Sequence, residues 1–276
     1  MACILLIDNG SKRADATLQL RRLAAGLSDR ISQPVYPVSL QHADAIDAAD
    51  LGGEPALIFS EFISSRLQQG IREFVAIPLF FGNSRALTSF IPQQIAMLEE
   101  KYGEFELVQT DTLYPLPHGD PRLAEILYDH TMQTIRMLDS EVHHAVLVEH
   151  GSPLPEVNKV RRDVAVMLQQ LLESQGHYSL EQAVMERRKG DQFDFNGDLL
   201  EDWLVAKAMD GVMHIVVVML FILPGRHAGE GGDIETICQE VMQRYPGLKV
   251  YVTPLVSEHP RLLDILESRL LAVSRS

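Results

Sequence analysis

The sequence contains an internal repeat, and this repeat constrains the fold more than any other feature. Similar segments recur in the same order at a nearly constant offset of 139 to 141 residues. The matched pairs are Ile4–Ser11 with Ala145–Ser152, Gly70 with Gly211, Pro78–Phe81 with Met219–Ile222, and Asp120–Leu123 with His259–Leu262. A single match would be chance, but an ordered set indicates a duplicated unit. We therefore expect two domains, residues 1–138 and residues 139–276.

The local pattern within each half is typical of a parallel α/β fold. Short apolar runs without alternation indicate strands that are buried on both faces of a sheet. These runs are Ile4–Ile7, Phe74–Leu79, Ala145–Val148 and Ile215–Leu223, with a further strand expected near Leu180–Met185. Segments with helical spacing lie between them, at Ala14–Leu27, Val157–Leu172, Leu199–Met209 and Ile234–Tyr245. The alternation predicts two tandem parallel-sheet α/β domains, each with all strand carboxyl ends at one edge.

Composition and charge exclude several classes of protein. The 276 residues include 24 Lys and Arg against 38 Asp and Glu, so the formal net charge is −14. This acidity argues against nucleic acids and anionic membranes as partners. Cys3 and Cys238 are too few for a disulfide framework. The longest apolar run, Ile215–Leu223, is too short to span a bilayer, and Asp8 comes too early for a signal peptide. We therefore expect a cytoplasmic protein without a membrane partner.

Three side chains of the second half follow predicted strands directly. His150 and His227 lie in loops after the first and the longest apolar run of this half, and Glu186 follows the strand between them. Two imidazoles and a carboxylate suit Fe, Co, Ni or Zn, and they could equally accept protons near neutral pH. If one ion is shared, the two imidazoles should lie within roughly 4–7 Å, given metal–nitrogen bonds of ~2.1 Å.

Structural interpretations remain open for each of these residues. His150 and His227 could simply hold loop backbone, and Glu186 could belong to a solvated, charged turn. Among the other histidines, we expect His214 in the core, because it opens a buried strand, and His130 at the surface.

The ordered motifs of the second half resemble the sirohydrochlorin chelatases of the CbiX/SirB type, which are class II, ATP-independent tetrapyrrole chelatases. The matching pieces are Val146–Ser152, Val184–Glu186, Val216–Phe221, Gly225–His227, Asp233–Ile234, Thr253–Leu255 and His259–Leu262. The resemblance covers most of residues 143–270, and the first half matches more weakly in the same order. It implies two tandem chelatase-like α/β domains with a cleft between them.

This resemblance also implies an activity. Such an enzyme, a lyase, inserts Co²⁺ or Fe²⁺ into sirohydrochlorin or a related tetrapyrrole in cobalamin or siroheme biosynthesis. Some relatives insert Ni²⁺, and the metal is always a substrate, so no tightly bound cofactor is expected. His150 and His227 would hold the metal and accept pyrrole protons, with Glu186 as a third ligand or proton acceptor. The residues expected to contact the macrocycle are Gly151, Ser152, Arg226 and Lys159.

The first half lacks these chemical groups. Asn9 and Gln41 stand where the second half has a histidine and a glutamate, and the loop Gly82–Ala86 contains no histidine. The simplest interpretation is one active site in the second half, with the first half as a wall of the cleft. Two fused halves could complete that cleft within one chain, so a monomer is compatible with the sequence. The alternative is a non-catalytic carrier of metal or tetrapyrrole, derived from a chelatase.

The negative net charge of the protein bears on how the site could bind an anionic substrate. Sirohydrochlorin is a polycarboxylate, and a uniformly acidic surface would repel it. We therefore expect a local group of basic residues, drawn from Arg226, Lys159, Arg161, Arg187, Arg188, Lys12 and Arg13.

Overall fold

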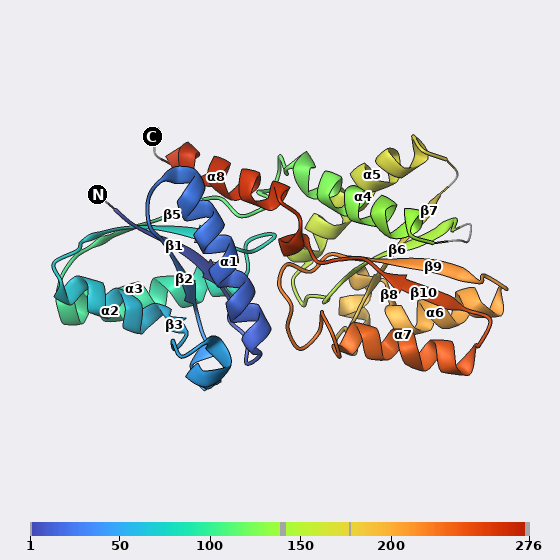
Figure 1. Cartoon of the computed structure of the whole chain (residues 1–276), viewed down its shortest axis with the longest axis horizontal. Helices are drawn as coiled ribbons and strands as arrows, with labels where there is room; N and C mark the ends of the chain where they lie inside the picture. Colours follow the sequence, from blue (N-terminus) through green and yellow to red (C-terminus); the bar gives the residue numbers. More distant parts are fainter. Residues whose placement is uncertain (1, 139–141, 177, 274–276) are drawn as a thin grey trace. The chain divides into compact units, whose positions relative to one another are not determined.

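The computed structural model of the chain describes residues 2–138, 142–176 and 178–273. It contains two compact units (Figure 1). The first comprises Met1–His118 with Pro260–Ser276, and the second comprises Gly119–His259. Each unit has one parallel five-stranded sheet with helices packed against it, which confirms the predicted fold class.

The sheet of the first unit has the strand order β3-β2-β1-β4-β5. Its strands are β1 (Cys3–Asp8), β2 (Val35–Ser39), β3 (Leu57–Ile58), β4 (Glu73–Pro78) and β5 (Glu106–Gln109). Its α-helices are α1 (Ala14–Ile31), α2 (Phe59–Gln68), α3 (Ile91–Tyr102) and α8 (Arg261–Val273). The central strand β1 is buried along its whole length, as its continuous apolar sequence requires.

The sheet of the second unit repeats this order as β8-β7-β6-β9-β10. Its strands are β6 (His144–Glu149), β7 (Ser179–Val184), β8 (Asp198–Leu199), β9 (His214–Met219) and β10 (Lys249–Val252). Its α-helices are α4 (Pro121–Arg136), α5 (Pro155–Glu173), α6 (Leu200–Met209) and α7 (Asp233–Arg244). The chain also forms short 3-10 segments at Ala43–Ala45, Ala48–Leu51, Asp191–Asn196 (η4) and Val256–Glu258 (η5), and a π-helical turn at Ala86–Phe90.

The predicted elements match this arrangement with one clear exception. Each predicted strand and helix falls on an observed one, but the apolar run Ile215–Leu223 is only partly a strand. The strand β9 ends at Met219, and the last four apolar residues belong to the loop that leads to His227. The order of the sheet changes direction between β6 and β9. Ligands of open α/β sheets bind beyond the carboxyl ends of the strands at such a point.

The repeated Pro-Arg motif marks the start of a helix in both repeats. At Asp120, the side chain accepts a hydrogen bond from the Arg122 backbone at 3.1 Å, and Pro121 occupies the first turn of α4. A capping carboxylate and a proline that needs no backbone partner both favour helix initiation. His259 takes the matching position before α8 and forms the carboxyl cap of η5.

These two helices pack against the other repeat. α4 packs against α5 and β9, whereas α8 packs against α1 and β4. His130 of α4 donates through Nε2 to the Leu255 carbonyl at 3.2 Å, and Arg269 of α8 donates to the Thr112 carbonyl at 2.8 Å. His130 is 4% exposed, so its predicted surface position is wrong. The compact units therefore differ from the sequence repeats by one helix each.

No described helix is long and apolar enough to cross a membrane. Both cysteines are free and buried.

Because α4 packs in the second unit and α8 in the first, a core substitution in α4 should destabilise the second unit. Leu127 is fully buried on α4, so Leu127→Ala should cost about 2–5 kcal/mol. The loss should appear as faster amide hydrogen exchange in β6 and β9, with β1 and β4 unaffected. Leu266→Ala in α8 is the matched control and should show the reverse pattern. Faster exchange in β1 after Leu127→Ala would contradict this assignment.

Candidate functional site

The three predicted site residues lie at adjacent strand ends of the second unit. His150 follows β6, Glu186 lies two residues beyond β7, and His227 lies in the loop after β9. Because the strands β9, β6 and β7 are neighbours in the sheet, the fold brings all three side chains to one edge. This edge includes the point at which the strand order changes direction, where a ligand is expected.

The distances agree with a shared small ion or proton. The ring centroids of His150 and His227 lie 4.6 Å apart, within the predicted range, and the rings are inclined by 72°. His150 Nε2 lies 3.3 Å from Glu186 Oε1. Two atoms that bind one ion at ~2.1 Å with angles near those of a tetrahedral or octahedral centre lie about 3.0–3.4 Å apart. The spacing of His150 and Glu186 is compatible with two ligands of a common ion and equally with a hydrogen bond.

Hydrogen bonds on the far side of each ring assign the tautomers. His150 Nδ1 lies 3.0 Å from the Gly151 carbonyl oxygen, which can only accept, so Nδ1 carries the proton. His227 Nδ1 lies 2.7 Å from Asp233 Oδ2, and an ionised carboxylate likewise only accepts. In the neutral rings, both Nε2 atoms therefore carry a lone pair. Nε2 of His150 faces a carboxylate oxygen, so the contact is attractive when a proton or a metal ion lies between the two atoms.

The site does not assemble a complete set of metal ligands. Within the described residues, no group of three His, Cys, Asp or Glu side chains is placed to hold an ion. The three side chains are also partly open to solvent, with His227 31%, His150 44% and Glu186 62% exposed. Such an arrangement can hold an ion through a few ligands while leaving coordination positions open for another molecule.

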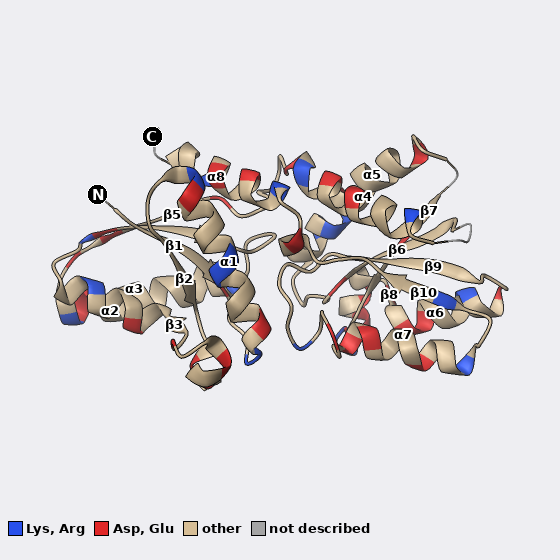
Figure 2. Cartoon of the chain, in the orientation of Figure 1, with Lys and Arg blue, Asp and Glu red and all other residues tan. Residues whose placement is uncertain are grey.

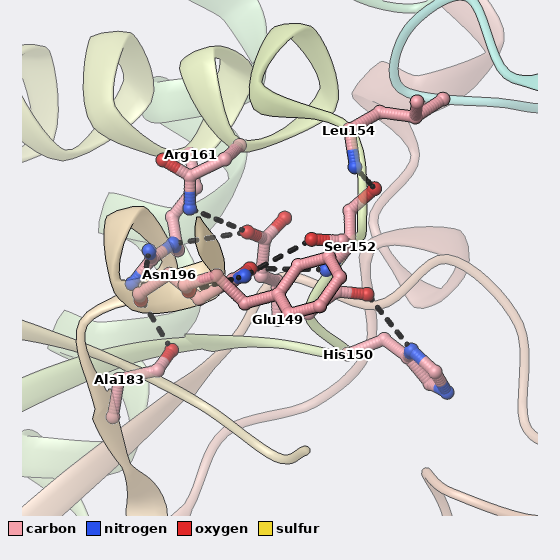
Figure 3. Close-up of polar contacts among 10 residues, drawn as sticks. Glu149, His150, Ser152, Leu154, Arg161, Ala183 and Asn196 are labelled. Atoms are coloured by element: carbon pink, nitrogen blue, oxygen red, sulfur yellow. Dashed lines mark hydrogen bonds and ion pairs between the residues drawn. The ribbon is translucent and has the colours of Figure 1, made fainter. Parts of the chain in front are cut away.

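A buried network supports the loop that carries His150 (Figure 3). Arg161 of α5 donates to Glu149 Oε1 at 3.1 Å, to the Ala183 carbonyl at 3.3 Å and to the Asn196 carbonyl at 2.7 Å. The Asn196 side chain in turn accepts from the Ser152 backbone at 3.1 Å and donates to its carbonyl at 3.0 Å. Burial raises the pKa of Glu149, and the Arg161 guanidinium opposes this shift.

Gly151 is required by the close approach of two loops. Its φ is 99°, and a Cβ atom there would lie 2.0 Å from the Glu186 carbonyl oxygen. The Glu186 backbone also donates to the His150 carbonyl at 3.0 Å. Any larger residue would separate His150 from Glu186, so this glycine brings the two functional side chains together.

The first unit repeats this geometry without its chemical groups. A Cβ on Gly10 would lie 1.7 Å from the Gln41 carbonyl oxygen, and Gln41 donates to the Asn9 carbonyl at 3.2 Å. Asn9 and Gln41 therefore occupy the positions of the histidine and the glutamate, as predicted. Beneath them, Asp8 has a buried Oδ1 without a hydrogen-bond partner. The residue matching Arg161 at the repeat offset is the buried Leu20, which offers no charge to that carboxylate.

The residues expected to contact the macrocycle differ in their exposure and in their hydrogen bonds. Arg226, next to His227, has a side chain that is 82% exposed, and Lys159 is exposed on the first turn of α5. The Ser152 hydroxyl accepts a hydrogen bond from the Leu154 backbone at 3.0 Å. The basic group expected around the site is smaller than predicted, because Arg161 is 2% exposed and pairs inside the protein. Its prediction as a surface cation is wrong.

Charge around the site is mixed in sign. Figure 2 shows acidic and basic residues on the helices and loops, with β6 and β9 almost free of them. Acidic residues gather at the first turn of α7, which carries Asp233 and Glu235. Arg187 also has an acidic neighbour, since it donates to Asp194 at 3.2 Å.

Sequence reasoning missed the supporting residues, although signals for two of them exist. Glu149 is a polar residue at the end of a buried strand, and Arg161 falls on the apolar face of its helix. A charged residue in such a position needs a partner of opposite charge. Asn196 carries no comparable signal, because its role depends on where η4 folds back.

The fold and the site define a class of protein: a duplicated α/β protein with one two-histidine, one-glutamate site at a strand edge. The sequence model of the CbiX family matches residues 3–134 and 144–273, so both repeats are covered. The chain belongs to the CbiX family. No curated protein sequence matches the chain.

Solved structures with the same fold include two SirB proteins and one CbiX protein. SirB from Bacillus subtilis with Fe³⁺ is 18% identical, with a TM-score of 0.68 over 98% of this chain and 95% of that one. The sirohydrochlorin chelatase SirB from Bacillus subtilis subspecies spizizenii with cobalt is 17% identical, with a TM-score of 0.68 over 100% and 96%. CbiX, the terminal enzyme of siroheme biosynthesis in denitrifying bacteria, is 15% identical, with a TM-score of 0.59 over 98% of both.

The buried carboxyl of Asp8, which has one oxygen without a hydrogen-bond partner, predicts that its replacement stabilises the protein in a pH-dependent way. Burial raises the pKa of Asp8 from 3.8 to about 6. Because the folded-state pKa lies above the unfolded one, this carboxyl lowers the free energy of unfolding as pH rises from 4 to 7. The loss over this range is about 2 kcal/mol, at about 1.4 kcal/mol for each pKa unit, because the unfolded carboxyl is already partly ionised at pH 4. Relative to the natural protein, Asp8→Asn should therefore gain about this amount between pH 4 and pH 7.

Urea unfolding of both proteins at several pH values measures that difference. A difference in unfolding free energy that stays constant from pH 4 to pH 7 would show that Asp8 titrates normally.

The buried ion pair between Glu149 and Arg161 predicts a loss of stability when its cation is removed. Arg161→Leu reproduces the residue of the first repeat but leaves Glu149 buried without its cation. Removing one partner of a buried pair typically costs about 3–5 kcal/mol. The double variant Arg161→Leu with Glu149→Gln should recover at least about 1 kcal/mol, because the uncompensated charge is gone. Urea unfolding tests this, and equal stability of single and double variants would refute the charge explanation.

Proposed function

We propose that this protein inserts a divalent metal ion, Co²⁺ or Fe²⁺, into sirohydrochlorin, as a chelatase of the lyase class. The observation that carries the proposal is the site itself. Two imidazoles with free Nε2 lone pairs and a carboxylate lie at the switch point of the sheet, in a chain of the CbiX family. The relatives of known structure support the choice of ions, since one holds Fe³⁺ and another holds cobalt.

The positions of the atoms support a role for each side chain. Nε2 of His150 and of His227 would bind the incoming ion, and Glu186 would act as a third ligand or take up a pyrrole proton. Insertion releases two protons from the pyrrole nitrogens, so the site must hold a metal and accept protons in turn. An imidazole and a carboxylate can do both near neutral pH.

A site with few protein ligands favours the transfer of a metal ion to another molecule over its storage in the protein. A metal held by four protein ligands would be trapped, whereas one held by few ligands keeps positions for the pyrrole nitrogens. We therefore propose that the metal is a substrate and that the protein needs no tightly bound cofactor. Imidazole and carboxylate ligands accept Co²⁺, Fe²⁺ and Ni²⁺ alike.

We further propose that the macrocycle contacts the loop of Gly151 and Ser152, with Arg226 and Lys159 binding its carboxylates. The guanidinium of Arg226 suits this role because its side chain is 82% exposed. A monomer acting in the cytoplasm fits these proposals, since both repeats lie in one chain and both cysteines are free thiols.

The test is a chelatase assay with Co²⁺ or Fe²⁺ and sirohydrochlorin, followed by absorbance. We expect the protein to accelerate insertion over metal and substrate alone. His150→Ala and His227→Ala should each lower the rate at least about 100-fold, as for the loss of a general base or ligand, and Glu186→Gln should lower it less. The control is His42→Asn, an exposed histidine of the first unit.

Each outcome separates the candidates. Unchanged rates in His150→Ala and His227→Ala would refute the assigned site. Tight binding of Co²⁺ or sirohydrochlorin without turnover would instead identify a carrier.

A further inference from the structure

The loop that carries His227 is fastened to the start of α7 at three points. The Asp233 backbone donates to the Arg226 carbonyl at 3.2 Å, and the Ile234 backbone donates to the His227 carbonyl at 3.1 Å. The third point is the 2.7 Å contact between the Asp233 carboxylate and His227 Nδ1. Gly232 allows this folding, because a Cβ atom there would lie 3.0 Å from the Gly229 carbonyl oxygen.

We propose that Asp233 is a positioning residue that holds His227 in the tautomer with a free Nε2 lone pair. The inference rests on the proposed function, in which that nitrogen binds the metal or accepts a proton. It adds a residue that the sequence identified only as part of a family motif.

The physical argument starts from the neutral imidazole, which carries one proton on either nitrogen. Only the tautomer with the proton on Nδ1 offers Nε2 to a metal ion. A charged acceptor at 2.7 Å favours that tautomer and also fixes the orientation of the ring. His150 reaches the same state through the Gly151 carbonyl. Both rings therefore have an acceptor at Nδ1. For His150 the acceptor is a backbone carbonyl, whereas for His227 it is a side chain that can be substituted.

The contact between Asp233 and His227 is specific to Asp233 and is not shared by the other acidic residue in the first turn of α7. Its carboxylate contacts His227 and, more weakly, Arg226, whose Nε lies 3.8 Å from the same oxygen. Glu235 lies in the same first turn of α7 and has a different partner, the Gly231 backbone, at 2.6 Å. Glu235→Gln therefore removes one negative charge from the same helix end while leaving the contact with His227 intact.

The tautomer of His227 can be read directly by ¹⁵N NMR of the metal-free protein labelled at histidine. In the natural protein, we expect Nδ1 to be protonated and Nε2 to be free. Asp233→Asn should shift this balance, because the amide of asparagine can donate to Nδ1 and stabilise the opposite tautomer. Asp233→Ala should give a mixture. Asp233 is 43% exposed, so both variants should fold, which circular dichroism verifies.

Metal binding and kinetics supply the second readout. Co²⁺ affinity measured by calorimetry should fall about 10–100-fold in Asp233→Asn, the usual effect of losing such a partner. The kcat for insertion should fall while the KM for sirohydrochlorin stays unchanged, and Asp233→Glu should restore part of both losses. Glu235→Gln should match the natural protein in every measurement.

The outcomes distinguish this inference from the proposed function. If Asp233→Asn keeps both the Nδ1-protonated tautomer and the Co²⁺ affinity, the inference is wrong, whatever the chelatase activity. If the tautomer and Co²⁺ affinity depend on Asp233 but the natural protein inserts no metal, the proposed function fails and the inference stands.

Discussion

The site depends on the buried ion pair between Glu149 and Arg161. A guanidinium taken out of water needs hydrogen-bond acceptors, and each nitrogen of Arg161 donates to a group from a different segment. The end of β6, the end of β7 and η4 are thereby fixed to one side chain. Through Asn196, the same network reaches the loop that begins with His150. The functional side chains are thus exposed, while the structure that places them is buried.

Among the described residues, the first unit has no such ion pair beneath the matching loop. It keeps the close approach of Gly10 to the Gln41 carbonyl, so that approach is formed by the backbone alone. It has neither the imidazole and carboxylate at the edge nor the guanidinium beneath, where Leu20 lies. Asp8 is a buried acid with an unpartnered oxygen. The side chains at the edge and those beneath them therefore differ together between the two described units.

Hydrogen bonds behind the rings decide what the histidines can do. A pair of imidazoles 4.6 Å apart is a common arrangement, and alone it does not specify a metal, a proton or a structural contact. The acceptors at both Nδ1 atoms hold the Nδ1 protons, so each neutral ring offers an Nε2 lone pair. At His150, Glu186 Oε1 also faces Nε2 and stabilises a proton or an ion there. An ion bound there keeps open positions, and this suits an enzyme that must release its metal to another ligand.

The sequence by itself determined the duplication, the α/β class and the placement of His150, Glu186 and His227 at strand ends. These follow from periodicity and from the rule that parallel strands end at one edge. Only the tertiary structure revealed that α4 and α8 pack against the other repeat, and that Arg161 is buried. Both depend on contacts between segments distant in the chain, which no local pattern records. The sequence therefore identified the groups that could react, and the tertiary structure decided which nitrogen of each histidine is free.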